Sequence, residues 1–99
     1  MRTLVRFAVA VDVMPKEGIA DPQGQTVERA LPSLGFPGMG QVRVGKRIEL
    51  VVDAEDAAAA EAAVRAACVR FLANPVIEDF TISVVEPAAG AHANGGRPA

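Results

Sequence analysis

The sequence predicts an α+β fold with the element order β-α-β-β-α-β. Three observations carry this prediction: apolar and polar residues alternate in four short stretches, an alanine-rich stretch precedes the last of them, and glycines and prolines separate the elements. Right-handed crossovers then place two helices on one face of a four-stranded antiparallel sheet. The expected architecture is a two-layer sandwich of ferredoxin-like topology.

The first strand is predicted at residues 4–13, where Phe7 and four valines occupy every second position. Aromatic and β-branched residues with a period of two are typical of a half-buried strand. Pro15 and Gly18 end the strand and begin a loop.

A helix is predicted to begin at Asp21-Pro22, because aspartate accepts the free amides of a first turn and proline suits the first helical position. Gly35 is a favourable C-terminal stop. Pro32 lacks an amide and its ring clashes with the preceding turn, so we expect a kink or an early end there. Helical spacing is shown by Val27, Ala30, Leu31 and Leu34.

The middle of the chain predicts two further strands, from alternation over residues 41–44 and over residues 47–52. Gly45-Lys46 lies between them. It predicts a tight hairpin turn, because glycine adopts a positive φ at little cost.

The second helix is predicted over the alanine-rich residues 54–73, with Asp53 as its cap and Asn74-Pro75 as its end. A last strand follows at residues 79–85, with Phe80, Ile82 and Val84 directed inward. The buried stripe of the helix is expected to comprise Ala57, Ala60, Val64, Ala67, Cys68 and Phe71.

One domain is predicted over residues 1–85, followed by a tail over residues 86–99 that lacks large apolar side chains and is expected to be disordered. With both helices on one face, the other face of the sheet is uncovered. We interpret this face as a contact surface, although monomers also tolerate a solvated face with scattered apolar residues. Its apolar residues are Ala8, Ala10, Val51 and Val85.

The formal net charge of -2 argues against non-specific binding to nucleic acid, which needs a basic footprint. The single cysteine, Cys68, excludes an intramolecular disulfide and indicates a reducing compartment. No run of about 18 apolar residues is present, and the N-terminus does not resemble a signal peptide. We therefore expect a cytoplasmic protein without a membrane span.

No catalytic, cofactor-binding or metal-binding residue is predicted. His92, the only histidine, lies in the tail, where nothing orients it, and Cys68 falls on an apolar stripe, where cysteine acts as a small hydrophobe. The spacing Gly35-x-x-Gly38-x-Gly40 follows a helix and precedes a strand, whereas a nucleotide-binding loop follows a strand and opens a helix.

Four segments occur in order along the chain: residues 16–24 (KEGIADPQG), 33–36 (SLGF), 42–46 (VRVGK) and 72–79 (LANPVIED). Together they resemble the PurS family, the small subunits of phosphoribosylformylglycinamidine (FGAM) synthase. The resemblance covers roughly residues 4–85.

The resemblance implies a non-catalytic assembly subunit in de novo purine (IMP) biosynthesis, in an enzyme that converts FGAR to FGAM with ATP and glutamine. The subunit would bridge a large synthetase subunit (PurL-like) and a glutaminase subunit (PurQ-like), and would self-associate as a dimer or further as a tetramer. ATP and Mg²⁺ would bind to the large subunit, and no cofactor to this chain. The expected partner contacts are Lys16, Gly18, Asp21, Gln23, Gly24, Arg43, Gly45, Lys46, Asn74, Pro75, Glu78 and Asp79.

Two alternatives accompany this interpretation. Arg43 and Lys46 suit carboxylates on a partner surface, but turn-forming loops with a purely local structural purpose would contain the same residue types. The alternative function is a small dimeric metabolite-binding regulatory module.

Overall fold

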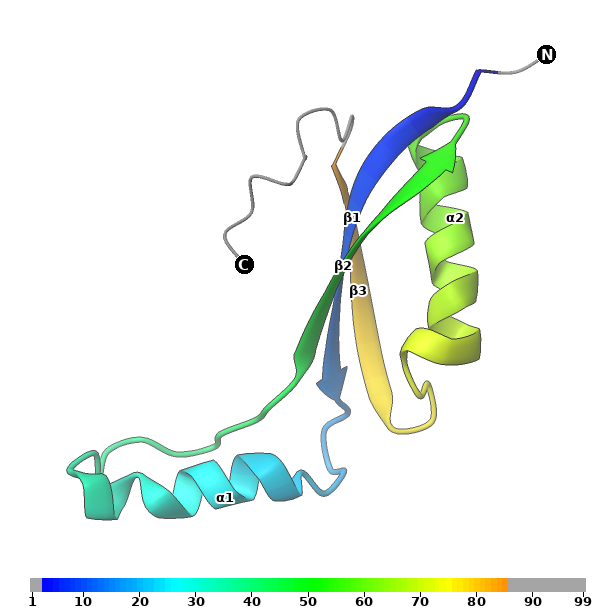
Figure 1. Ribbon diagram of the computed structural model, residues 1–99. Coiled ribbons are helices and arrows are strands. Elements are labelled where there is room, and N and C mark those ends of the chain that lie inside the picture. The colour runs from blue at the N-terminus through cyan, green and yellow to red at the C-terminus, as the bar shows by residue number, and fades with distance from the viewer. Residues whose placement is uncertain (1–2, 86–99) are drawn as a thin grey trace.

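The computed structural model describes residues 3–85, so the tail predicted over residues 86–99 lies outside the described part of the chain. The described part is an α+β fold (Figure 1). Its elements in chain order are β1 (Val5–Pro15), α1 (Pro22–Ala30), a 3₁₀ turn (Pro32–Leu34), β2 (Lys46–Ala54), α2 (Ala57–Ala67), a π-helical turn (Cys68–Leu72) and β3 (Glu78–Val85).

Within residues 3–85 the sheet has three strands rather than the predicted four, in the order β2-β1-β3, and both pairs are antiparallel. β1 is the central strand, in which Val9 lies opposite Leu50 on one side and Val84 on the other. The strands predicted over residues 4–13, 47–52 and 79–85 are confirmed at nearly the predicted bounds.

The strand predicted over residues 41–44 is wrong, and so is the hairpin predicted at Gly45-Lys46. The amides of Val42 and Val44 donate to the side-chain carboxylates of Glu28 (3.0 Å) and Asp21 (2.9 Å) instead of to a neighbouring strand. This segment therefore runs along α1, and β2 begins only at Lys46, where the chain meets β1.

The core lies between the sheet and α2 (Figure 1). Every second residue of β1 from Phe7 to Val13 is buried on the face that α2 covers, as the period of two predicts. The inward direction predicted for the apolar residues of β3 is confirmed. The core consists of Phe7, Val9, Val11, Val13, Ala54, Ala60, Val64, Cys68 and Ala73, with Phe80, Ile82 and Val84 packed against it.

The helix α1 does not cover the sheet, which corrects the prediction of two helices on one face. Figure 1 shows α1 projecting from the end of the sheet together with the segment that returns to β2. We call residues 16–45 the arm. The radius of gyration is 17.4 Å, whereas a compact domain of this length has about 12–13 Å. The chain is therefore elongated, with the arm as its extension.

The helix start predicted at Asp21 is confirmed, because the Gly24 N–H donates to Asp21 Oδ1 (2.9 Å) and Pro22 occupies the first helical turn. The early end predicted near Pro32 is also confirmed, since α1 stops at Ala30 and a 3₁₀ turn closes on Gly35 at φ 99°.

The cap predicted for the second helix is wrong. Asp53 lies in β2, and the N-cap is Asp56, which accepts the Ala59 N–H at 2.8 Å. β2 continues to Ala54 because β1 supplies pairing partners that far. The helix therefore begins three residues later than the start that alanine helix propensity predicts.

The π-helical turn at the end of α2 changes which residues are buried. Cys68 is buried and Leu72 packs against the core. These two residues follow Val64 at successive steps of four. Phe71, predicted in the buried stripe, is 86% exposed, and Ala67 is exposed as well. The extra residue in a π turn rotates the following side chains relative to an α-helix, so the helical period does not extend to Phe71.

The second face of the sheet is covered by no element in residues 3–85. Val51 and Val85 are exposed there, as predicted, while Ala10 is buried between its neighbours. Charged residues surround them in three exposed ion pairs: Arg6–Asp53, Arg47–Asp12 and Arg47–Glu49, each at 3.1 Å.

Candidate subunit interface

Three loops meet at the end of the sheet from which the arm projects. The register places Val13 opposite Lys46 and Pro15 opposite Glu78, so the end of β1 lies beside the starts of β2 and β3. The loops predicted to contact partners leave the sheet at this end. The topology therefore brings together three segments that are far apart in sequence.

The first and third loops are joined by Lys16. Its N–H donates to the Ile77 carbonyl (2.9 Å), which continues the β1–β3 ladder, and its ammonium forms an ion pair with Asp79 (2.7 Å). The Lys16 side chain is 39% exposed and that of Asp79 is 68% exposed, so solvent screens the ion pair and it contributes little stability.

The turn before β3 is held by its own polar groups. The Asn74 N–H donates to Glu78 Oε1 (2.7 Å), the Val76 N–H donates to Asn74 Oδ1 (3.1 Å), and the Glu78 N–H returns to the Asn74 carbonyl (2.8 Å). Pro75 lies exposed at the tip of this turn. The turn is thus a preformed surface feature.

The first and second loops are joined by Asp21. Its Oδ1 caps α1 and its Oδ2 accepts the Val44 N–H, and these two hydrogen bonds hold the pKa of the carboxyl below its usual range. Gly24 allows this contact, because a β-carbon at this position would lie 2.6 Å from the Val42 carbonyl oxygen and would clash with it. The Asp21 carboxylate therefore fixes how the arm is folded.

The second loop is anchored to β1 at two points. The Arg43 guanidinium donates to the Pro15 carbonyl. A side chain at Gly45 would collide with Met14 and with the Val13 carbonyl, so only glycine allows the chain to pass so close. Gly18, in contrast, is exposed in open space with φ +84° and provides a turn.

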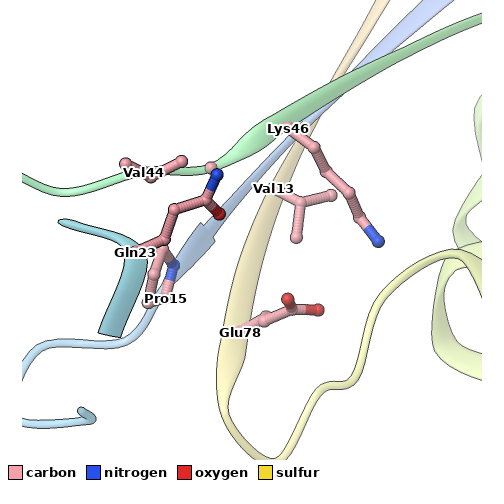
Figure 2. A pocket seen from close by; sticks show the side chains of 7 residues that line it. Val13, Pro15, Gln23, Val44, Lys46 and Glu78 are labelled. Atoms are coloured by element: carbon pink, nitrogen blue, oxygen red, sulfur yellow. The ribbon is translucent and has the colours of Figure 1, made fainter. Parts of the chain in front are cut away.

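A small hollow lies where the three loops meet (Figure 2). In Figure 2, Lys46 from β2 and Glu78 from β3 extend on either side of Val13. The volume is roughly 150 Å³, below the 300–1,000 Å³ of ordinary small-molecule sites. The hollow suits a side chain of a partner protein better than a nucleotide. It is lined by Val13, Pro15, Gln23, Val44, Gly45, Lys46 and Glu78.

The described residues contain no catalytic constellation. Cys68 is fully buried, and burial raises the pKa of its thiol, which keeps it protonated and unreactive. His92 lies outside the described residues. Within residues 3–85 no three His, Cys, Asp or Glu side chains gather as metal ligands, and no helix is long and apolar enough to cross a membrane.

Two features of this region were not predicted. Glu28, like Asp21, accepts a backbone N–H of the segment that returns to β2. The sequence signal for this role was the position of Glu28 two helical turns after Asp21, on the same side of the helix. Phe71 and Val76 are 86% and 77% exposed on either side of Asn74. They place apolar surface next to the third loop, and the π turn that exposes Phe71 had no sequence signal.

Comparison with known proteins gives one consistent result. The family described as "PurS: Phosphoribosylformylglycinamidine (FGAM) synthase" matches residues 8–86. The PurS subunit of Mycobacterium leprae is 47% identical over 78 residues, which cover 74% of this chain and 89% of the relative. That of Bacillus subtilis is 39% identical over 83 residues, covering 84% of this chain and 98% of the relative.

Solved structures agree in fold. The PurS subunit of Thermotoga maritima superposes with a TM-score of 0.75 at 35% identity, covering 83% of this chain and 94% of that one. A chain in the structure of PurLQS from the same organism superposes with a TM-score of 0.74, covering 81% and 98%. A further relative, from Methanocaldococcus jannaschii, is described as a subunit acting in the purine biosynthetic pathway. The chain therefore belongs to the PurS family, and it is a subunit of phosphoribosylformylglycinamidine synthase in purine biosynthesis.

Proposed function

We propose that the chain is a non-catalytic assembly subunit that bridges a large synthetase subunit (PurL-like) and a glutaminase subunit (PurQ-like). The complete enzyme would convert FGAR to FGAM with ATP and with ammonia released from glutamine. ATP and Mg²⁺ would bind to the large subunit and no cofactor to this chain. The chain would act as a dimer within this assembly.

The observation that carries the proposal is the arm. Its apolar residues have no core to pack against: Leu34 is 68% exposed, and Val27, Phe36 and Met39 are exposed as well. A nine-residue helix is marginal by itself, so α1 gains stability from packing against another chain. The arm is thus suited to contact between subunits.

The meeting point of the three loops supports the same function. A bridging subunit needs preformed surfaces rather than an acid, a base or a nucleophile. Seven of the twelve predicted contact residues lie in the loops at one end of the sheet, and the other five lie at the adjoining starts of α1, β2 and β3. They include cations at Lys16 and Lys46 and carboxylates at Glu78 and Asp79. Mixed charge of this kind gives specificity between partner surfaces. Excluding water at such junctions would keep ammonia from being lost between two active sites.

Reconstitution tests the proposal. Synthetase and glutaminase subunits from the same source are mixed with and without this chain, and glutamine-dependent FGAM formation is followed. Activity is expected only when the chain is present. Full activity without the chain, together with no co-elution, would refute a bridging role.

A charge reversal then tests the loops. Lys46→Glu is expected to weaken capture of the partners about tenfold or more, because it places a carboxylate where a partner carboxylate is expected. Arg70→Glu makes the same charge change in the π-helical turn that follows α2 and is the matched control. Equal capture by both variants, with unfolding curves unchanged, would remove the hollow from the proposed interface.

A further inference from the structure

The last strand of the described chain, β3, is an outer strand of the sheet. It pairs with β1 along one edge, and no strand of residues 3–85 pairs with its other edge (Figure 1). The pairing with β1 runs without a bulge from Glu78 to Val85. The outer edge of β3 is therefore a regular row of backbone groups, and the register decides which groups it presents.

One hydrogen bond sets the direction of these groups. The Lys16 N–H donates to the Ile77 carbonyl at 2.9 Å, and the two residues lie opposite each other where the β1–β3 register continues. In an antiparallel ladder, bonded pairs alternate with non-bonded pairs. Pro15, which has no N–H, accordingly lies opposite Glu78 in a non-bonded pair. The odd-numbered residues of β3 thus bond to β1, and the even-numbered residues direct their backbone groups outward.

The outward groups belong mainly to Phe80, Ile82 and Val84. No residue of 3–85 bonds to the N–H of any of the three. The Glu78 N–H is used in the preceding turn, where it donates to the Asn74 carbonyl. Water or another strand must satisfy the remaining groups. An unpaired edge of this kind is a template for a strand of another chain.

β3 lacks the features that usually protect an outer strand. Lysines, prolines and bulges normally prevent an edge from pairing with other chains, and β3 contains none of them. Its two charged residues, Glu78 and Asp79, stand at its beginning, and residues 80–85 (FTISVV) are uncharged and mostly β-branched. Exposed segments of six residues with this composition pair readily with other strands. The composition therefore favours an edge that is covered in the assembled enzyme.

The side chains along this edge define the segment that fits it. Phe80, Ile82 and Val84 are half-buried on the side that α2 covers. A strand with apolar residues at every second position would extend that layer, because cross-strand apolar pairs stabilise a sheet. Thr81 and Ser83 are exposed on the uncovered face, where small or polar residues suit them.

Charge distinguishes the possible sources of such a segment. Both charged residues of β3 are acidic. Asp79 forms an ion pair with Lys16, whereas no ion pair within residues 3–85 includes Glu78. A lysine or arginine opposite Glu78 would complete a cross-strand pair of opposite charge. A second copy of β3 brings only carboxylates, so a basic segment of a different subunit fits this edge better.

We propose that the outer edge of β3 binds an extended segment of a partner subunit of the synthase as a fourth strand. The segment has apolar residues at alternate positions and a lysine or arginine opposite Glu78. This inference rests on the bridging role proposed above, and it names the backbone groups through which one partner is bound.

Hydrogen exchange of the wild-type chain tests the pairing directly. In the isolated chain, the amides of Phe80, Ile82 and Val84 are expected to exchange rapidly, while those of Thr81 and Ser83, which bond to β1, exchange slowly. In the assembled enzyme the three outward amides are expected to exchange about tenfold more slowly or less, so the alternation disappears. The amides of Thr81 and Ser83 are the internal control, since β1 protects them in both states.

A proline substitution tests the contribution of one outward N–H to partner capture. Val84→Pro removes an N–H that faces away from β1, a position at which an outer strand tolerates proline. Val84→Ala also shortens the side chain but keeps the N–H, and it is the matched control. Val84→Pro is expected to weaken capture of a partner subunit about tenfold, and Val84→Ala by less than about twofold. Unfolding curves of both variants establish that they fold, and the exchange measurement on the wild type needs no variant.

The outcomes separate this inference from the proposed function. Partners that are captured and support FGAM formation, while the amides of Phe80, Ile82 and Val84 exchange as in the isolated chain, overturn the edge pairing and leave the bridging role standing. Equal capture by folded Val84→Pro and Val84→Ala overturns it as well. Protection of these amides in the isolated chain that increases with its concentration means that a second copy occupies the edge, which overturns the proposed occupant. No capture of either partner by the wild type overturns the bridging role and the inference with it.

Discussion

At the scale of single residues, the arm depends on one carboxylate. The two oxygens of Asp21 serve different parts of the chain: one caps α1 through the Gly24 N–H, and the other holds the Val44 N–H, 23 residues later in the sequence. Both hydrogen bonds favour the ionised form, which is why the pKa of Asp21 is lowered. Protonation therefore loosens both contacts together.

The position of Val44 is expected to depend on acidic pH. Because the folded pKa of Asp21 lies below that of the unfolded chain, its contribution is complete above the ordinary aspartate value of about 4 and is lost as the pH falls through the lowered pKa. Hydrogen exchange at the Val44 amide should accelerate on acidification relative to amides of β1. Asp21→Asn should accelerate it at neutral pH.

The matched control for that measurement is Asp56→Asn, which makes the same change at the cap of α2. It should leave exchange at Val44 unchanged. Equal protection of Val44 in the wild type and in Asp21→Asn would contradict the assigned role of the carboxylate.

At the scale of elements, α2 and the π turn divide apolar side chains into buried and exposed sets. Val64→Ala is expected to lower the free energy of unfolding by about 1–3 kcal/mol, because it opens space in the core, whereas Phe71→Ala should change it by less than about 0.5 kcal/mol. Denaturant unfolding measures both. A large loss of stability in Phe71→Ala would mean that this ring is buried in the folded chain.

The elements also show what the sequence predicts well. β1 and β3 follow from alternation, since one face of each packs on the core. The start of α1, with its cap at Asp21 and Pro22 in the first turn, follows from local chemistry. Residues 41–44 alternate equally well, yet their amides bond to Glu28 and Asp21. Alternation indicates which side chains are half-buried. It does not indicate which groups accept the hydrogen bonds of the backbone amides.

The grouping of the candidate loops was predictable in part. The resemblance names three loops as expected partner contacts, which stays a prediction, and the order of strands brings these loops to one end of the sheet. The projection of α1 was not predictable, because a helix with an apolar stripe has the same sequence whether its own sheet or another chain covers that stripe. The exposure of Phe71 was not predictable, because a π turn has no signature in the pattern of apolar residues.

At the scale of the whole molecule, the arm and the sheet differ in what stabilises them. The sheet and α2 share a core, to which α1 contributes no residue in the described part of the chain. In dilute solution of the isolated chain, amides of α1 should exchange with solvent much faster than those of β1. Under the proposed function they should be protected in the assembled enzyme, where the arm would pack against another chain.

Hydrogen exchange of the isolated and assembled chain, compared residue by residue, measures this difference. The amides of β1 are the internal control, since they are paired on both sides in either state. Protection of α1 that equals that of β1 in the dilute chain would contradict an arm that depends on its partners.

The central position of β1 also governs how the chain acquires its fold during synthesis. β1 is made first, but its partners are β2, which begins only at Lys46, and β3, which ends at Val85. In the described part of the chain no two neighbouring strands of the sheet are joined by a short turn, so each of these pairings closes a long loop. Folding is therefore expected to be slow for a chain of this size, and the apolar face of β1 stays exposed until nearly the whole domain has been translated.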